Sequence, residues 1–227
     1  MDVSADEAGG RAEAPASWRI DPFAITDFGR TPHQMESLFC FVPAVAGKKA
    51  TVIAGKIQDF LGGCGHGGGP FDRIRAMTAS GTLDENLRRV RLGKYGLLAR
   101  CYATAAADGD LDLRAAEPGR LERIPGFGMK SSRFFVLHSR PGARVGVIDT
   151  HLLKFLRAIG TERVPDTVPT GRDYTRLEAA VLAEADRLGL DPADFDLRVW
   201  SWYSSGNRAA PAFGAPEGAL APGTGAA

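Results

Sequence analysis

The amino-acid sequence predicts an all-α fold, and three observations support this prediction. Apolar residues recur at helical spacing along most of the chain, residues that start and stop helices bound these stretches, and no convincing alternating run indicates a multistranded sheet. With 227 residues, 44% of them apolar and 24% charged, the chain can form one large domain or two small lobes with a sizeable core. The expected exception is a short extended piece near residues 144–148.

The expected helices follow from local signals. Thr31 followed by Pro32 marks a helix start, and Pro43 is expected to interrupt that helix. Residues 82–85 match a capping box in which Thr82 would cap a later helix. Further apolar stripes at helical spacing lie at residues 53–61, 97–105 and 174–188.

Both ends of the chain are expected to be disordered tails. Residues 1–17 are rich in Ala, Gly, Asp and Glu, and residues 209–227 are almost wholly Ala, Gly and Pro. Neither segment buries enough apolar surface to offset the entropy lost on ordering it. The working domain is therefore expected to span residues 18–208.

Cysteine usage and hydropathy indicate a cytoplasmic protein. The longest mostly apolar stretch, residues 38–46, is far shorter than the roughly 20 residues of a membrane span, and the acidic first residues do not form a signal peptide. The cysteines are odd in number and far apart, which fits neither a disulfide framework nor a four-thiolate zinc or iron–sulfur site. They are Cys40, Cys64 and Cys101.

The glycine-rich segment 62–69 admits two interpretations. Its amides could hold a phosphate, and Cys64 with His66 could contact a metal. A phosphate loop needs a strand before it and a Lys-Ser/Thr pair after it, and neither is present. A flexible loop between two helices is therefore favoured.

Positive charge is concentrated in one part of the chain. Residues 119–160 contain eight Lys and Arg residues against two acidic ones. Clustered Lys and Arg can bind a polyanion, because they release counterions from a phosphate backbone. The alternative is an ordinary solvated surface.

The sharpest signal is the segment 121–130, Leu-Glu-Arg-Ile-Pro-Gly-Phe-Gly-Met-Lys. Pro125, Gly126 and Gly128 cannot continue a helix, yet helix-compatible residues flank them, so two short helices at about 118–139 are expected to meet in a tight hairpin. Such a hairpin exposes backbone N–H groups at the start of its second helix, where a DNA phosphate can bind closely. Considered alone, it could equally be a helix–helix turn with a glycine cap.

A second motif, Val-Ile-Asp-Thr-His-Leu, follows at residues 147–152. Together the two motifs resemble the helix-hairpin-helix DNA glycosylases of base-excision repair, and the Gly-x-Gly-Met-Lys form is most similar to the archaeal-type 8-oxoguanine DNA glycosylase/AP lyases. Residues 39–50 and 195–200 resemble the first core helix and the carboxy-terminal Leu-Asp-Leu-x-x-Trp of those enzymes. The resemblance spans about residues 30–206 and implies a two-lobed helical glycosylase fold with a helix-hairpin-helix motif.

The resemblance implies two catalytic residues. The Lys130 amine would attack the sugar C1′ and form a Schiff base, and the Asp149 carboxylate would stabilise the cationic sugar. A helix N-terminus disfavours an additional cation, which favours the free amine at Lys130. In isolation Lys130 would be a solvated lysine and Asp149 an ordinary N-cap, but the pair at this spacing favours catalysis.

The resemblance also implies contacts with DNA and an ion. Trp200 and Phe134 are expected to form the base pocket, although a core tryptophan is the alternative for Trp200. A monovalent cation, Na⁺ or K⁺, is expected on backbone carbonyls, while an iron–sulfur cluster is excluded by the cysteine count. The expected DNA-binding residues are Gly126, Gly128, Arg133 and His151, with a helix-surface histidine as the alternative for the last. The expected carbonyl donors are those of Glu122, Ile124 and Phe127.

The expected function is a base-excision repair DNA glycosylase with AP lyase activity. It would remove an oxidised purine, 8-oxoguanine first among them, from duplex DNA through a lysine Schiff base assisted by an aspartate. The alternatives are a non-catalytic helix-hairpin-helix DNA-binding protein and a glycosylase for a different modified base. The expected partner is damaged double-stranded DNA, and the protein is expected to be a monomer that acts on the nucleoid without contacting a membrane.

Overall fold

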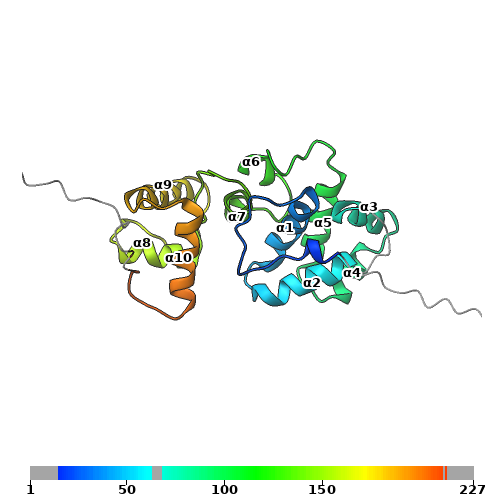
Figure 1. Ribbon diagram of the computed structural model, residues 1–227, viewed down its shortest axis with the longest axis horizontal. Helices are drawn as coiled ribbons and strands as arrows, with labels where there is room; N and C mark the ends of the chain where they lie inside the picture. Colours follow the sequence, from blue (N-terminus) through cyan, green and yellow to red (C-terminus); the bar gives the residue numbers. More distant parts are fainter. Residues whose placement is uncertain (1–14, 63–67, 212, 214–227) are drawn as a thin grey trace, which may run out of the picture. The chain divides into compact units, whose positions relative to one another are not determined.

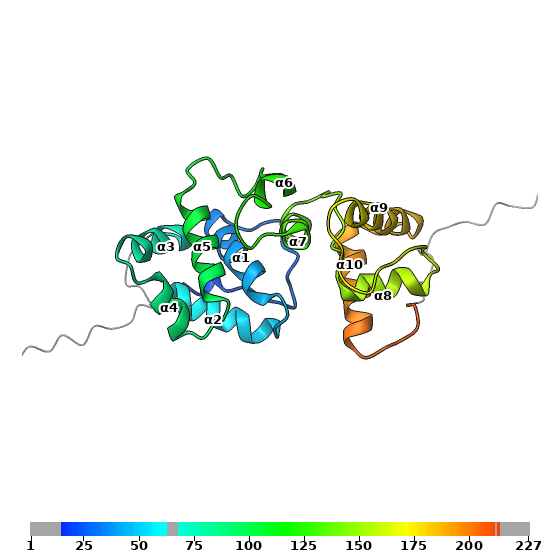
Figure 2. The same cartoon turned by 180° about the vertical axis from the view of Figure 1, so that it is seen from behind.

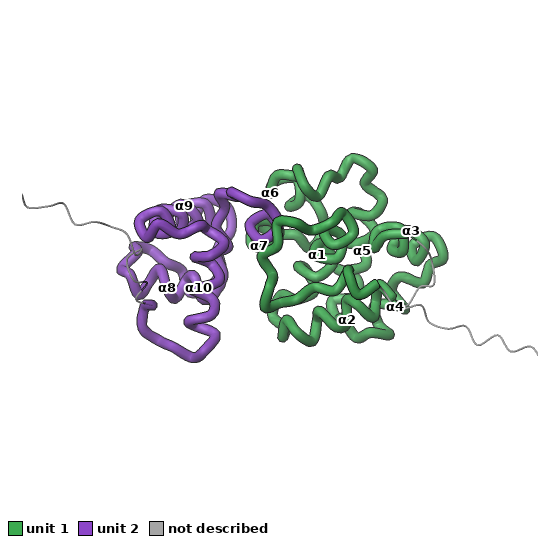
Figure 3. The backbone as a smooth tube through the Cα atoms, in the orientation of Figure 1, with its two compact units in different colours: residues 1–135 green, residues 136–227 purple. Residues whose placement is uncertain are grey.

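The computed structural model describes residues 15–62, 68–211 and 213. Within these ranges the chain forms ten α-helices and one short 3-10 helix and contains no strand (Figure 1), so the predicted all-α class is confirmed. The chain divides into two compact units, Met1–Phe135 and Val136–Ala227 (Figure 3). We call them the amino-terminal and the carboxy-terminal unit. None of the described helices is long and apolar enough to cross a membrane.

The helix order can be followed from both sides in Figures 1 and 2. The amino-terminal unit contains η1 (Ala16–Trp18), α1 (Pro32–Val45), α2 (Ala50–Gly62), α3 (Pro70–Ala79), α4 (Leu83–Arg89), α5 (Tyr95–Ala107) and α6 (Pro118–Leu121). The helix α7 (Met129–Ser139) crosses the boundary between the units. The carboxy-terminal unit contains α8 (Thr150–Ala158), α9 (Gly171–Arg187) and α10 (Pro192–Ser204).

Helix α1 is central to the amino-terminal unit and packs against α2, α3 and α5. It begins where the sequence predicts, because the Thr31 side chain accepts from the Gln34 N–H while the Gln34 side chain accepts from the Thr31 N–H. The predicted interruption at Pro43 is wrong, since the helix continues to Val45. Pro43 costs the helix one backbone hydrogen bond, but it is buried, so packing of the helix compensates for that loss.

The start of α4 corrects a second expectation. The helix begins at Leu83 as predicted, but Thr82 makes no side-chain cap hydrogen bond. Its hydroxyl instead lies 2.9 Å from the Ser80 hydroxyl. The predicted capping box is therefore wrong, because the Thr82 hydroxyl pairs with the Ser80 hydroxyl instead of accepting from a backbone N–H at the start of α4.

The three helices of the carboxy-terminal unit pack on one another. Phe155 of α8 and Phe195 of α10 are fully buried and meet edge to face, with ring centroids 5.3 Å apart. Phe213 lies against both rings, and the Trp202 indole N–H donates to the Ala209 carbonyl. The packed part of this unit therefore extends beyond the domain boundary at residue 208 that the sequence suggests.

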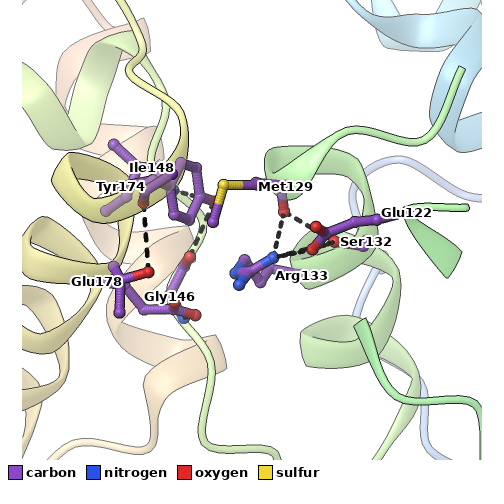
Figure 4. Close-up of polar contacts among 10 residues, drawn as sticks. Glu122, Met129, Ser132, Arg133, Gly146, Ile148, Tyr174 and Glu178 are labelled. Carbon is purple, nitrogen blue, oxygen red and sulfur yellow. Dashed lines mark hydrogen bonds and ion pairs between the residues drawn. The ribbon is translucent and has the colours of Figure 1, made fainter. Parts of the chain in front are cut away.

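The segment 144–148 belongs to no helix and no strand. Side chains of α9 satisfy its backbone groups (Figure 4): Gly146 N–H donates to Glu178, Ile148 N–H donates to the Tyr174 hydroxyl, and that hydroxyl donates to the Gly146 carbonyl. A helix thus supplies the hydrogen bonds that a neighbouring strand would otherwise provide.

Two sequence predictions concern residues that border the gaps in the described ranges or fall within them. Residues 15–17 of the predicted amino-terminal tail are described, and Ala16–Trp18 form η1. Cys64 and His66 of the glycine-rich segment lie outside the described residues.

Candidate active site

The predicted hairpin is present, and its turn and the start of α7 lie in the amino-terminal unit. Helix α6 ends at Leu121 and α7 begins at Met129, in agreement with the expected pair of short helices at about 118–139. Its apolar residues anchor it, because Leu121, Ile124 and Phe127 are all buried. The Phe127 ring stacks on Phe39 of α1, with centroids 4.4 Å apart and planes 14° from parallel. The apolar positions of the motif therefore fix the turn against the core of this unit.

The two glycines of the hairpin differ in backbone conformation and in the space around them. Gly126 has a φ of +92°, which other residues rarely adopt, and a Cβ there would also meet Leu97 at 3.4 Å and Cys101 at 3.6 Å. Gly128 has an ordinary φ, and a Cβ there would meet nothing within 4 Å. A side chain at Gly126 would therefore strain the turn, whereas a side chain at Gly128 would extend into open space.

Backbone amides are available at the start of α7. In the described part of the chain, the N–H groups of Gly128, Lys130 and Ser131 donate to no acceptor. Gly128 and Lys130 are exposed, and Ser131 is half-buried. Free amides at a helix N-terminus attract an anion, because the helix dipole adds positive potential there.

A polar cluster closes the hairpin (Figure 4). Glu122 and Arg133 form an ion pair, and the Ser132 hydroxyl lies 3.0 Å from a Glu122 carboxylate oxygen and 2.9 Å from the Met129 carbonyl. The Arg133 side chain is 13% exposed, so this pair is substantially shielded from water. Arg133 therefore ties α7 to the turn, and its predicted DNA contact stays a prediction.

Lys130 is the second residue of α7 and is exposed. It lies next to the open amides of the hairpin, as the sequence motif implies. Phe134, one turn further along α7, is half-buried. The roles of both residues toward DNA stay predictions.

The backbone carbonyls expected to hold a monovalent cation fit such an ion in donor chemistry. The Ile124 carbonyl accepts from the Phe127 N–H at 3.0 Å and keeps a second lone pair, while the carbonyls of Glu122 and Phe127 accept no hydrogen bond among the described residues. Carbonyl oxygens suit hard cations. No group of three or more His, Cys, Asp or Glu side chains that could hold a metal occurs among the described residues.

Asp149 begins α8 in the carboxy-terminal unit. One carboxylate oxygen, Oδ1, accepts from the N–H groups of His151 at 2.8 Å and Leu152 at 2.9 Å. The N-cap interpretation is therefore confirmed. The residue is half-buried, and within the described ranges Oδ2 takes part in no hydrogen bond, so one oxygen remains for another role.

The His151 ring is in contact with two aromatic rings of α10. The His151 ring stacks on Tyr203, with centroids 6.3 Å apart and planes 16° from parallel, and meets Trp200 edge to face at 6.4 Å. Trp200 is 46% exposed, so the alternative of a core tryptophan is not supported. His151 is therefore in contact with Asp149 through its backbone N–H and with Trp200 through its ring. Lys130 belongs to the other unit, and its proximity to Asp149 stays a prediction.

A buried polar pair was not anticipated from the sequence. His138 of α7 is fully buried, and its Nε2 lies 3.3 Å from Oδ2 of Asp196, which is 8% exposed. Both residues interrupt apolar runs, Phe-Phe-Val-Leu-His and Phe-Asp-Leu, and this is the signal that could have revealed them. The pair joins α7 to α10 inside the carboxy-terminal unit.

The cationic segment 119–160 is partly neutralised in three dimensions. Arg120 pairs with Asp108, Arg144 pairs with Asp186, and Arg157 pairs with Asp166. These acids lie outside the segment, so its local excess of positive charge is smaller than the sequence suggests. Lys130 and Lys154 are exposed and belong to no ion pair in the described part of the molecule.

No family model and no curated protein matches this chain. Comparison with solved structures shows that the all-helical fold of the described residues is similar to that of a glycosylase/lyase of known structure. This similar structure is a crystal structure of the 8-oxoguanine glycosylase/lyase of Methanocaldococcus jannaschii in complex with a 15mer DNA containing 8-oxoguanine. The TM-score is 0.56 at 17% sequence identity, over 82% of this chain and 88% of that chain. The resemblance predicted from the motifs is thereby confirmed at the level of the fold.

Proposed function

We propose that this protein is a base-excision repair DNA glycosylase with AP lyase activity, and that it removes an oxidised purine, 8-oxoguanine first among the candidates, from duplex DNA. The observation that carries the proposal is the hairpin, whose open amides at Gly128, Lys130 and Ser131 lie beside an exposed lysine. The fold shared with an 8-oxoguanine glycosylase/lyase supports it.

In the proposed reaction Lys130 is the nucleophile. Its neutral amine forms a bond to the sugar C1′ as the glycosidic bond breaks, and the base departs with the bonding electrons and takes up a proton. Ring opening then yields a protonated Schiff base. Solvent then takes a proton from C2′, a C2′–C3′ double bond forms, and the 3′ phosphate departs with the electrons of the C3′–O bond, which cuts the strand by β-elimination.

Asp149 supports the same reaction electrostatically. Its Oδ2 faces no hydrogen-bond partner among the described residues, while Oδ1 is held by two backbone N–H groups. A carboxylate held in this way costs little reorganisation when positive charge develops on the sugar.

The remaining site residues are assigned to binding. The hairpin amides would hold a phosphate, assisted by a monovalent cation on the carbonyls of Glu122, Ile124 and Phe127, and His151 and Arg133 would contact the DNA backbone. Trp200 offers an exposed aromatic face on which an everted base could stack, and Phe134 would complete the pocket.

Borohydride trapping tests the proposal. Wild-type protein should form a covalent adduct with a duplex that contains 8-oxoguanine, and Lys130→Gln should form none, because an amide cannot form a Schiff base. Lys154→Gln is the matched control, since Lys154 is also exposed on a helix and belongs to no ion pair in the described part. An undiminished adduct with Lys130→Gln would reject the assignment of the nucleophile.

The same gel separates the alternatives. Adduct formation on a duplex with another modified base, and none with 8-oxoguanine, would retain the enzyme class and change the substrate. Duplex binding without any adduct on damaged or abasic DNA would instead indicate a non-catalytic helix-hairpin-helix protein.

A further inference from the structure

Tyr203 lies at a point where two buried polar atoms have no partner. In the described part of the chain, neither Nδ1 of His151 nor the hydroxyl oxygen of Tyr203 makes a hydrogen bond, although both atoms are inaccessible to solvent. The two rings are nevertheless in contact, stacked with planes 16° from parallel. The interaction between these residues is therefore made by ring faces and not by polar groups.

This arrangement determines what orients the imidazole. A functional histidine ring is usually oriented by a hydrogen bond at its second nitrogen, and His151 has none at Nδ1. Its backbone N–H is fixed by the Asp149 cap, which leaves the side-chain torsions as the remaining freedom. Tyr203 is 5% exposed on α10, so its ring is a rigid surface that restricts those torsions.

The phenol contributes no charge to this contact. Burial raises the pKa of Tyr203, so its hydroxyl stays neutral throughout the pH range in which DNA binding is measured. Replacement of the hydroxyl by hydrogen removes an unpaired buried polar atom and keeps the ring face. A Phe at this position should therefore perform the same task.

We propose that Tyr203 is a positioning residue whose ring holds the His151 imidazole in place beside Trp200, so that His151 is preorganised to contact the DNA backbone. The inference rests on the proposed function for the DNA contact, and on the geometry of the carboxy-terminal unit for the positioning. Preorganisation increases affinity because less side-chain freedom is lost on binding.

The first test uses no DNA. The chain has four histidines, so the ring-proton signals of His151 can be assigned by NMR as the set that His151→Ala removes. The stacked Tyr203 ring should shift these signals upfield. We expect Tyr203→Phe to keep the shift and Tyr203→Leu to move the signals downfield, because only the contribution of the Trp200 ring remains, with the other histidine signals unchanged. Signals that stay in place in Tyr203→Leu would overturn the positioning role.

The second test is a double-mutant cycle on duplex affinity. We expect His151→Ala and Tyr203→Leu each to weaken binding of an undamaged duplex roughly tenfold, and the double variant to be no weaker than His151→Ala. Tyr203→Phe should bind within about twofold of wild type, because the ring is retained. Additive losses would show that Tyr203 acts through the stability of the unit, and a loss in Tyr203→Phe equal to that in Tyr203→Leu would assign the effect to the hydroxyl. Either result would overturn the proposal.

The two tests separate this proposal from the function on which it rests. A wild-type protein that binds no duplex would contradict the proposed function. The NMR shift of Tyr203→Leu tests the contact between the Tyr203 and His151 rings whether or not the protein binds DNA.

Discussion

A single carboxylate, Asp149, has two separable tasks. Oδ1 caps α8, and the proposed reaction uses the charge. Asn caps a helix about as well as Asp, so Asp149→Asn should retain the melting temperature and the duplex affinity while base excision falls by about 10²-fold or more. Asp149→Ala should lose excision and also about 0.5–2 kcal/mol of unfolding free energy.

Thermal melting, duplex titration and single-turnover excision of these two variants check this prediction. Normal turnover by Asp149→Asn would show that Asp149 acts only as the N-cap of α8. Loss of melting temperature in Asp149→Asn would mean that the charge, and not the hydrogen bonds, stabilises the helix.

Gly128 allows the phosphate site to be tested without disturbing the fold. Because a Cβ there meets nothing within 4 Å, Gly128→Leu should fold normally and block only an incoming group. We expect duplex affinity to fall about tenfold or more, equally for damaged and undamaged sequences, since phosphate contacts carry no sequence information.

The matched control for this prediction is Gly55→Leu. Gly55 is also exposed, and a Cβ there also meets nothing within 4 Å. This variant should bind DNA like wild type. A Gly128→Leu defect confined to damaged DNA would instead show that the hairpin reads the base.

At the scale of the element, the hairpin depends on the ion pair that connects its turn to α7. Glu122 and Arg133 are both largely shielded, so removing either charge breaks their ion pair in a poorly hydrated place and should cost roughly 1–3 kcal/mol of unfolding free energy. Urea unfolding should therefore show similar losses for Glu122→Gln and Arg133→Gln, and the double variant should lose less than their sum.

Additive losses would contradict a coupled pair. DNA titration of the same proteins addresses the contact predicted from the sequence. A loss of affinity in Arg133→Gln that Glu122→Gln lacks would assign that contact directly to Arg133.

For the molecule as a whole, the buried thiols predict how stability changes with pH. Burial raises the pKa of Cys101 to about 12 and that of Cys40 well above its usual value. Above about pH 8.5 the unfolded chain loses thiol protons that the folded chain retains, so the unfolded state binds fewer protons and the unfolding free energy falls as pH rises. Each thiol contributes at most about 1.4 kcal/mol per pH unit.

Urea midpoints measured between pH 8 and pH 10 check this prediction. They should fall with pH in the wild type and fall less steeply in Cys101→Ala, which removes one of the titrating groups. The same slope in both proteins would show that the Cys101 thiol does not carry the effect.

The sequence by itself determined the all-α class, most helix positions, the hairpin and the Asp149 cap. These features depend on contacts between neighbours along the chain. Gly126 needs a backbone conformation that other residues rarely adopt, and the Asp149 side chain reaches N–H groups only two and three residues away. Local patterns therefore predicted them.

Only the tertiary structure decided which polar groups meet. His138 and Asp196 are 58 positions apart, and no local pattern predicts their pairing. Packing likewise keeps Pro43 inside α1, directs Arg133 to Glu122 and places Tyr203 against His151. Partners of this kind depend on which surfaces the fold buries together, and that is settled by the free energy of the whole unit and not by any short segment of sequence.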